Sequence, residues 1–107
     1  MNNEDTRSRR ELFLSSLDRA LDTFGVNVHD VVYYKLREWY GVSRDDIPLK
    51  PELFVKTVDQ FFGVGAAIVS RSIRKELEAQ TGIKDLGTKD LLTALRTAYR
   101  EQILGNL

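Results

Sequence analysis

The hydrophobic pattern is most informative in residues 28–41, where apolar side chains recur at helical spacing on two faces. The main stripe consists of Val28, Val32, Leu36 and Trp39. A second stripe, on the nearly opposite face, contains Val31 and Tyr34. A helix that is apolar on two sides needs neighbours on two sides. We therefore predict that this segment is the central helix and that Trp39 is largely buried.

Four further segments show one apolar face each at a period of 3.6 residues. These predicted helices cover about residues 11–24, 51–62, 66–80 and 88–103. Gly25, Gly41 and Gly82 are expected to end helices, Asn27 to cap one, and Pro51 to begin one. Ile47–Pro48 is expected to be extended, because a residue before proline avoids the helical region. The pattern predicts an all-α bundle of about five helices with short loops.

Length and composition limit the class of protein. The chain of 107 residues is expected to form one helical domain over residues 11–107, preceded by a flexible polar tail over residues 1–10. Sixteen basic and sixteen acidic residues cancel, whereas nucleic-acid binders usually carry a basic excess. No apolar run approaches the roughly 18 residues of a membrane span, and the N-terminus lacks a signal-peptide core. We expect a cytoplasmic protein with no membrane contact.

Few residues offer chemistry. The chain has no cysteine, so it has no disulfide or thiolate site, and its single histidine, His29, lies in no metal-binding spacing. His29 is expected to be solvated or to cap a helix. Asp18 and Asp22, one helical turn apart, are expected to be solvated. Gly63–Gly65 could cradle a phosphate, but a tight turn is the preferred interpretation. We expect a non-enzymatic protein with no catalytic residue, metal or cofactor.

Basic residues gather on the outer faces of the last two predicted helices. They are Arg71, Arg74 and Lys75 on the fourth helix, and Arg96 and Arg100 on the fifth. If the two faces adjoin, these residues would form a patch that attracts anions. The alternative is a solvated amphipathic surface, which we prefer because glutamates are interleaved with the cations. The patch is the basis of a second hypothesis, a nucleic-acid-binding transcriptional regulator.

Some apolar residues fall off the predicted core faces and remain for a partner. They are Leu12, Val31, Tyr34 and Leu104. Covering such residues would supply an interface with another protein or with a second copy of the chain. The leading hypothesis is therefore a protein-interaction module, with a partner protein or a homodimer as the expected assembly.

Several short motifs occur in a distinctive order over about half of the chain. They are Asp30–Leu36, Tyr40–Val42, Asp46–Pro48, Pro51–Phe54, Phe62–Val69, Glu76–Leu77 and Gly82–Ile83. In these motifs the chain resembles the nitrosopumilus-type output domains described from ammonia-oxidising archaea. The resemblance implies a compact helical output module of archaeal signalling proteins. It assigns no catalytic or binding residue, and it does not include the predicted fifth helix.

Overall fold

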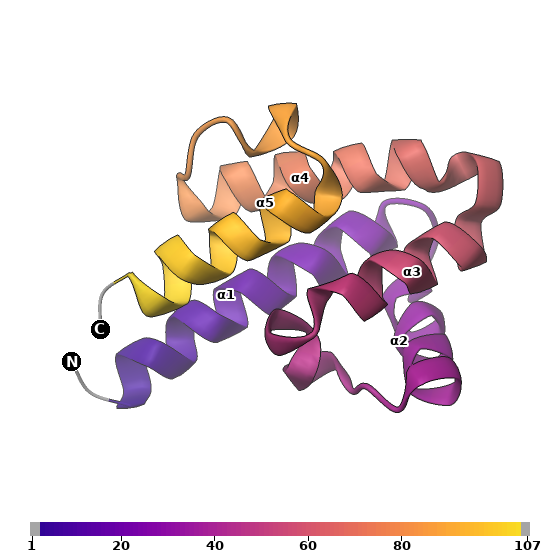
Figure 1. Cartoon of the computed structure of the whole chain (residues 1–107), viewed down its shortest axis with the longest axis horizontal. Coiled ribbons are helices and arrows are strands. Elements are labelled where there is room, and N and C mark those ends of the chain that lie inside the picture. The colour runs from indigo at the N-terminus through magenta and orange to yellow at the C-terminus, as the bar shows by residue number, and fades with distance from the viewer. Residues whose placement is uncertain (1–2, 106–107) are drawn as a thin grey trace.

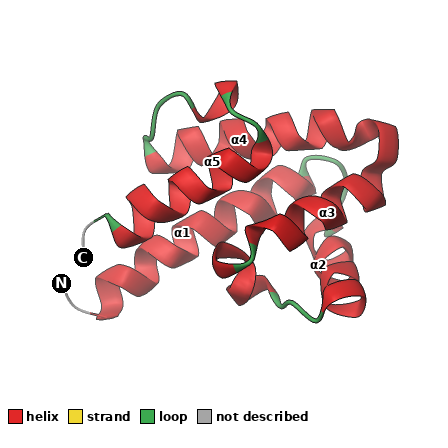
Figure 2. Ribbon diagram, viewed as in Figure 1, coloured by secondary structure: helices red, strands yellow, loops and turns green. Residues whose placement is uncertain are grey.

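The computed structural model describes residues 3–105, and within them it contains helices and loops but no strand (Figures 1 and 2). The predicted all-α bundle is confirmed. The five α-helices are α1 (Asn3–Asp22), α2 (Val28–Tyr40), α3 (Pro51–Phe62), α4 (Ala66–Thr81) and α5 (Leu91–Ala98). Four shorter helical turns join or extend them: η1 (Arg44–Leu49), η2 (Gly63–Gly65), η3 (Leu86–Thr88) and the π-helical η4 (Tyr99–Leu104).

α1 is the helix around which the others are arranged. It runs through the middle of the molecule and packs against α2, α4, η1 and η4 (Figure 1). Phe13, Leu17 and Leu21 on its inner face are fully buried. The helix begins at Asn3, earlier than the expected start near residue 11, so residues 3–10 of the expected flexible tail belong to α1. Residues 1 and 2 of the predicted tail lie outside the described residues.

α2 lies at the side of the bundle, where it packs chiefly on α3 and α1, so its predicted central place was wrong (Figure 1). Val32, Tyr33 and Leu36 face the core. Trp39 is 41% exposed, which corrects the expectation that it is buried. Tyr33 is buried instead, because its hydroxyl donates to Asp18 Oδ1 at 2.6 Å and its polar end is thereby satisfied.

The expected helix ends are confirmed at three places. Gly41 and Gly82 adopt the left-handed conformation after α2 and α4, and Pro51 is the first residue of α3. Two expectations were wrong. Asn27 is left-handed and its side chain makes no capping hydrogen bond. Ile47–Pro48 lies inside η1, because a 3-10 turn buries both side chains against the core.

The core is one continuous cluster drawn from every α-helix. Its largest fully buried side chains include Phe13 of α1, Phe54 of α3, Ile73 and Leu77 of α4, and Leu95 of α5. All four residues that were expected to be buried on the fourth helix, from Ala66 to Leu77, are buried. Helical periodicity therefore identified the inner faces of α1, α3, α4 and α5.

α3 and α4 form one helical run, Pro51–Thr81, that folds back on itself at Gly63–Gly65 (Figure 1). By length and composition alone, this run is apolar enough to cross a membrane, which is weak evidence because core helices of soluble proteins also satisfy those criteria. Only 28% of its most apolar window is buried in the structure. The expectation that no stretch approaches the apolar content of a span needs correction for this run.

Candidate interaction surfaces

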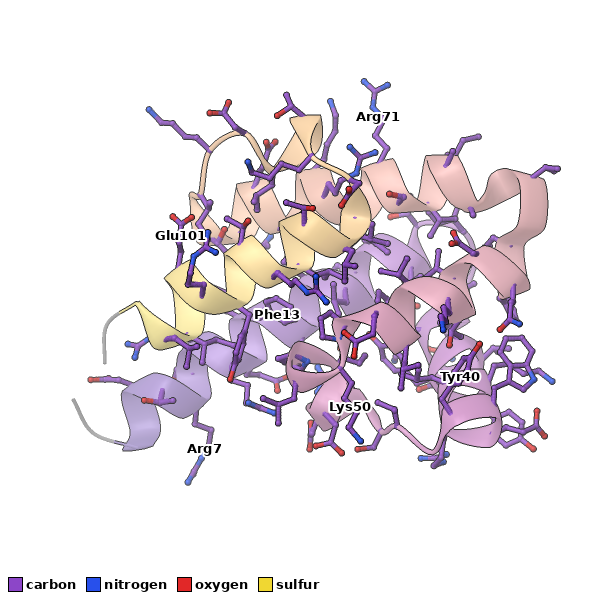
Figure 3. All side chains as sticks on the ribbon, viewed as in Figure 1. Arg7, Phe13, Tyr40, Lys50, Arg71 and Glu101 are labelled. Carbon is purple, nitrogen blue, oxygen red and sulfur yellow. The ribbon has the colours of Figure 1, made fainter. Side chains whose placement is uncertain are left out.

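The basic face of α4 borders a hollow of about 440 Å³. Its lining consists of Arg71, Arg74, Lys75, Glu78, Gly87 and Thr88. Arg71 is exposed and points away from the body of the molecule (Figure 3). Three of the five predicted cations therefore line one hollow. Glu78 also lines it, and its negative charge weakens the attraction of the hollow for an anion.

Arg74 holds the loop between α4 and α5 in place. Its Nη1 donates to the carbonyl oxygens of Gly87 at 2.7 Å and Lys89 at 2.8 Å, and its Nε donates to Ser70. From the same helix, Glu78 accepts a hydrogen bond of 2.8 Å from the amide of Gly87. Arg74 is therefore a structural residue, which corrects its placement on a solvated face.

The two predicted cations of the last helix do not line this hollow. Arg96 of α5 lies 3.6 Å from the carboxylate of Glu52 on α3, in an exposed ion pair. Arg100 is exposed in η4, the next element along the chain. The structure thus brings Arg71, Arg74 and Lys75 together around one hollow. Arg96 pairs with α3 instead, so the five predicted cations do not form one patch.

The apolar residues predicted to bind a partner also separate. Val31 and Tyr34 lie on α2, whereas Leu104 lies in η4 towards the other end of the long axis (Figure 1). All three are exposed, and Leu12 is half-buried. The prediction that Val31, Tyr34 and Leu104 share one surface is therefore wrong, although Val31 and Tyr34 lie on the same helix.

One side of α2 presents aromatic residues around a lysine. We call Val31, Tyr34, Lys35 and Trp39 the α2 flank. Val31, Tyr34 and Trp39 are 48%, 53% and 41% exposed. The Lys35 ammonium lies 5.9 Å from the centre of the Tyr34 ring and 5.6 Å from that of Trp39, so one cation contacts both π-systems. Sequence analysis missed Trp39 here because a helical projection placed it with the core residues.

Exposed apolar side chains also gather at the end of the molecule where α1 meets α2 and α3 meets α4 (Figure 1). We call this group the apolar tip; it consists of the exposed Phe24, Val26, Val64 and Ile68 together with the half-buried Phe62. The Phe24 and Phe62 rings have centroids 6.3 Å apart, which joins the two turns. Sequence analysis assigned Phe24 and Phe62 to inner faces and missed the tip, although charge-free stretches mark it.

A polar network links α1, α2 and η1. Arg44 donates from Nη2 to Asp18 at 2.7 Å and to Glu11 at 2.8 Å, and from Nε to Asp18 at 3.1 Å. Hydrogen bonding to Asp18 raises the pKa of Arg44, and burial beside the same carboxylate raises the pKa of Tyr33. Asp18 therefore anchors two elements, so its predicted solvation was wrong.

His29 lies between two carboxylates at the corner between α1 and α2. Its Nδ1 is 2.7 Å from Asp22 Oδ1 and its Nε2 is 3.2 Å from Asp30 Oδ1. Asp22 also accepts the backbone N–H of His29, so it caps α2 and is not simply solvated. Burial lowers the pKa of His29, but the hydrogen bond and charge of Asp22 outweigh burial, and the pKa lies above its ordinary value.

The side chains at this corner are not arranged to hold a metal ion. Between residues 3 and 105, no group of three or more histidine, aspartate or glutamate side chains has a geometry suited to a metal. A second hollow, of about 350 Å³, lies between α3, α4 and the start of α5, and apolar residues such as Val55 and Leu92 line it. Asp90 at its rim already accepts the Thr93 amide at 2.7 Å as the cap of α5.

Comparisons with known proteins found no match: no protein-family model fits the chain, and no curated protein or solved structure is detectably similar to it.

Proposed function

We propose that this protein is a non-enzymatic interaction module in signalling or regulation, and that the α2 flank binds its protein partner. The observation that carries the proposal is the exposure of Tyr34 and Trp39 on one helix, with the Lys35 ammonium against both rings. Tyrosine and tryptophan dominate the energetic centres of protein interfaces, because they bury a large area and lose few rotamers.

The polar residues of this helix suit the edge of such an interface. Lys35 Nζ lies 3.2 Å from Glu38 Oε1, and the Tyr34 hydroxyl donates to Glu38 Oε2 at 3.4 Å. Glu38 thus contacts Tyr34 directly and Trp39 only through Lys35, and this ordering before a partner arrives lowers the entropy cost of binding. The resemblance to archaeal output domains favours a signalling partner, and a second copy of the chain is the simplest one to test.

Sedimentation velocity over a range of concentrations tests the homodimer. We expect concentration-dependent association that the Tyr34→Ala/Trp39→Ala variant loses, while the control Leu49→Ala, an exposed apolar residue on η1, associates as the wild type does. For a different partner, a photo-crosslinking residue at position 34 should give a specific adduct in cells of the source organism. A protein that stays monomeric and yields no adduct would contradict the proposal.

A nucleic-acid-binding regulator is the second candidate, supported by the exposed Arg71 and Lys75 at the rim of the basic hollow. Anisotropy titrations with random duplex DNA and RNA at low and moderate salt test it. The informative variant is Arg71→Gln/Lys75→Gln, which keeps the structural Arg74. Micromolar binding that weakens steeply with salt and disappears in this variant would support the second candidate over the first.

A further inference from the structure

The two longest stretches of this chain without an acidic or basic residue meet at one end of the molecule. They are Thr23–His29, counting histidine as neutral, and Gln60–Ser70. Charged residues make up 30% of the sequence, so a charge-free stretch as long as Gln60–Ser70 is unusual here. The first covers the loop between α1 and α2 and the start of α2, and the second covers the turn between α3 and α4 with the adjoining ends of both helices (Figure 1). Together they carry the apolar tip.

The apolar side chains of the tip project into solvent. Val64 is fully exposed between two glycines in η2, Val26 is 92% exposed and Ile68 is 67% exposed. Behind them, Phe62 packs on Phe24, with ring centroids 6.3 Å apart, and edge-on against Phe61 at 4.9 Å. The aromatic rings support the turns from which the valines protrude.

We propose that the apolar tip docks on the surface of a lipid membrane, with Val64 and its neighbours at the boundary between headgroups and acyl chains. The two hollows described above are lined by residues other than those of the tip, and the exposed side chains of the tip project into solvent. A projecting turn fits a fluid surface that closes around it, whereas a protein partner would have to offer a matching pocket. Peripheral insertion of this kind buries apolar side chains about 5–10 Å deep.

The charged residues near the tip indicate which lipid headgroups the tip would bind. The charged residues that border the two stretches are Asp22, Asp30, Asp59 and Arg71. Three of these four are acidic, so an anionic surface would repel the tip and a neutral, zwitterionic surface would not. Insertion stays shallow, because the backbone N–H groups of the η2 turn would lack partners in the hydrocarbon core. The protein is peripheral in this proposal, in contrast to the expectation of no membrane contact.

Flotation with phosphatidylcholine vesicles tests the proposal. We expect the wild type to float with the vesicles, and Val64→Asp and Ile68→Asp each to reduce the bound fraction about tenfold or more, since a buried apolar side chain is replaced by a charge. The matched control is Leu49→Asp, which places the same charge on another exposed apolar residue and should bind as the wild type does. Binding to phosphatidylcholine should change little with salt, and added phosphatidylserine should weaken it, because the acidic residues that border the tip are repelled by an anionic surface.

A fluorescence measurement checks the depth and does not depend on loss of binding. In Val64→Trp/Trp39→Phe the only tryptophan is at the tip, and we expect its emission to shift to shorter wavelength with vesicles and to be quenched by brominated acyl chains. Vesicle binding that survives Val64→Asp, or that requires phosphatidylserine, would overturn the proposal. So would a lipid-free dimer that Val64→Asp dissociates, because the tip would then be a protein interface. The Tyr34→Ala/Trp39→Ala variant leaves the tip unchanged. A failure of the partner-binding proposal can therefore be distinguished from a failure of the membrane proposal.

Discussion

Exposure on α2 divides its aromatic residues into two roles. Tyr33 is 8% exposed and gives its hydroxyl to Asp18, so it serves the core. Tyr34 and Trp39 keep one face in water, and Lys35 lies against both of their rings. An aromatic side chain that contributes little to the core is free to contribute to binding, which is why the α2 flank carries the proposed function.

Trp39→Ala should therefore destabilise the fold by only about 1 kcal/mol, because the side chain is partly exposed and leaves no enclosed cavity. The comparison is Leu36→Ala on the same helix, where full burial should make the loss about 2–5 kcal/mol. Urea unfolding followed by far-UV circular dichroism gives both values. Equal losses for the two variants would show that Trp39 is a core residue.

Hydrogen bonds between elements set the positions of two loops. Arg74 and Glu78 of α4 hold the loop that leads into α5, and Asp22 and His29 hold the corner between α1 and α2. In each case a side chain that looks solvated on its own helix forms a hydrogen bond with the next segment: Arg74 donates to backbone carbonyls, Glu78 accepts from a backbone amide, and Asp22 contacts the His29 ring. The orientation of a neighbouring element therefore depends on a few polar contacts at its end.

Arg74→Gln should cost about 1–3 kcal/mol, because glutamine is too short to keep both carbonyl contacts and leaves them without a donor. Arg71→Gln/Lys75→Gln on the same helix should change the free energy of unfolding by less than about 1 kcal/mol in total. Thermal unfolding of the three proteins tests the contrast. A double variant as unstable as Arg74→Gln would mean that the whole basic face is structural.

The His29–Asp22 pair should make stability depend on pH. The pKa of His29 is raised above 6.5 in the folded state, so its contribution is complete below 6.5 and is lost as pH rises through the folded pKa. The pKa of Asp22 is lowered below 3.8: burial alone would raise it, but the hydrogen bond with His29 prevails, so its contribution is lost as pH falls through that lower pKa.

His29→Gln should therefore be less stable than the wild type by up to about 1 kcal/mol between pH 4 and pH 6.5, with the gap narrowing at higher pH. Urea midpoints measured from pH 4 to pH 9 give this profile. A gap that widens above neutral pH would contradict the assigned direction.

The whole molecule is held by one core, because side chains from all five α-helices join a single cluster around α1. Neither α3 nor α4 could bury its apolar face alone, and their turn at Gly63–Gly65 lets each cover the other. The same arrangement pushes the turn residues outward. The exposed apolar tip is therefore a consequence of how the helical run folds back, and it is available for the membrane contact proposed above.

Unfolding should be a single cooperative transition. Far-UV circular dichroism reports all the helices, whereas the emission of Trp39, the only tryptophan, reports α2 at the side of the bundle. We expect both signals to give the same midpoint in urea, because Val32 and Leu36 tie α2 into the common core. An earlier midpoint for the tryptophan signal would show that α2 detaches before the rest unfolds.

The sequence by itself determined the helical class, most helix ends and the inner faces of four helices, because periodicity, glycine and proline act within a few residues of their own position. Gly41, Pro51 and Gly82 needed no partner to be identified. The start of α1 was missed, since its first turns are polar and give no apolar period. The apolar tip was also missed, since a charge-free stretch does not show whether its apolar side chains face the core or the solvent.

Only the tertiary structure decided which helix is central, which aromatic residue is buried, and which cations remain in solvent. A helical projection places Trp39 on the core stripe and Tyr33 off it, whereas the structure exposes Trp39 and buries Tyr33, whose hydroxyl donates to Asp18 on another helix. Arg74 differs from Arg71 only through the carbonyls of a loop thirteen residues further along the chain. These outcomes depend on contacts between distant segments, and a pattern within one segment does not contain them.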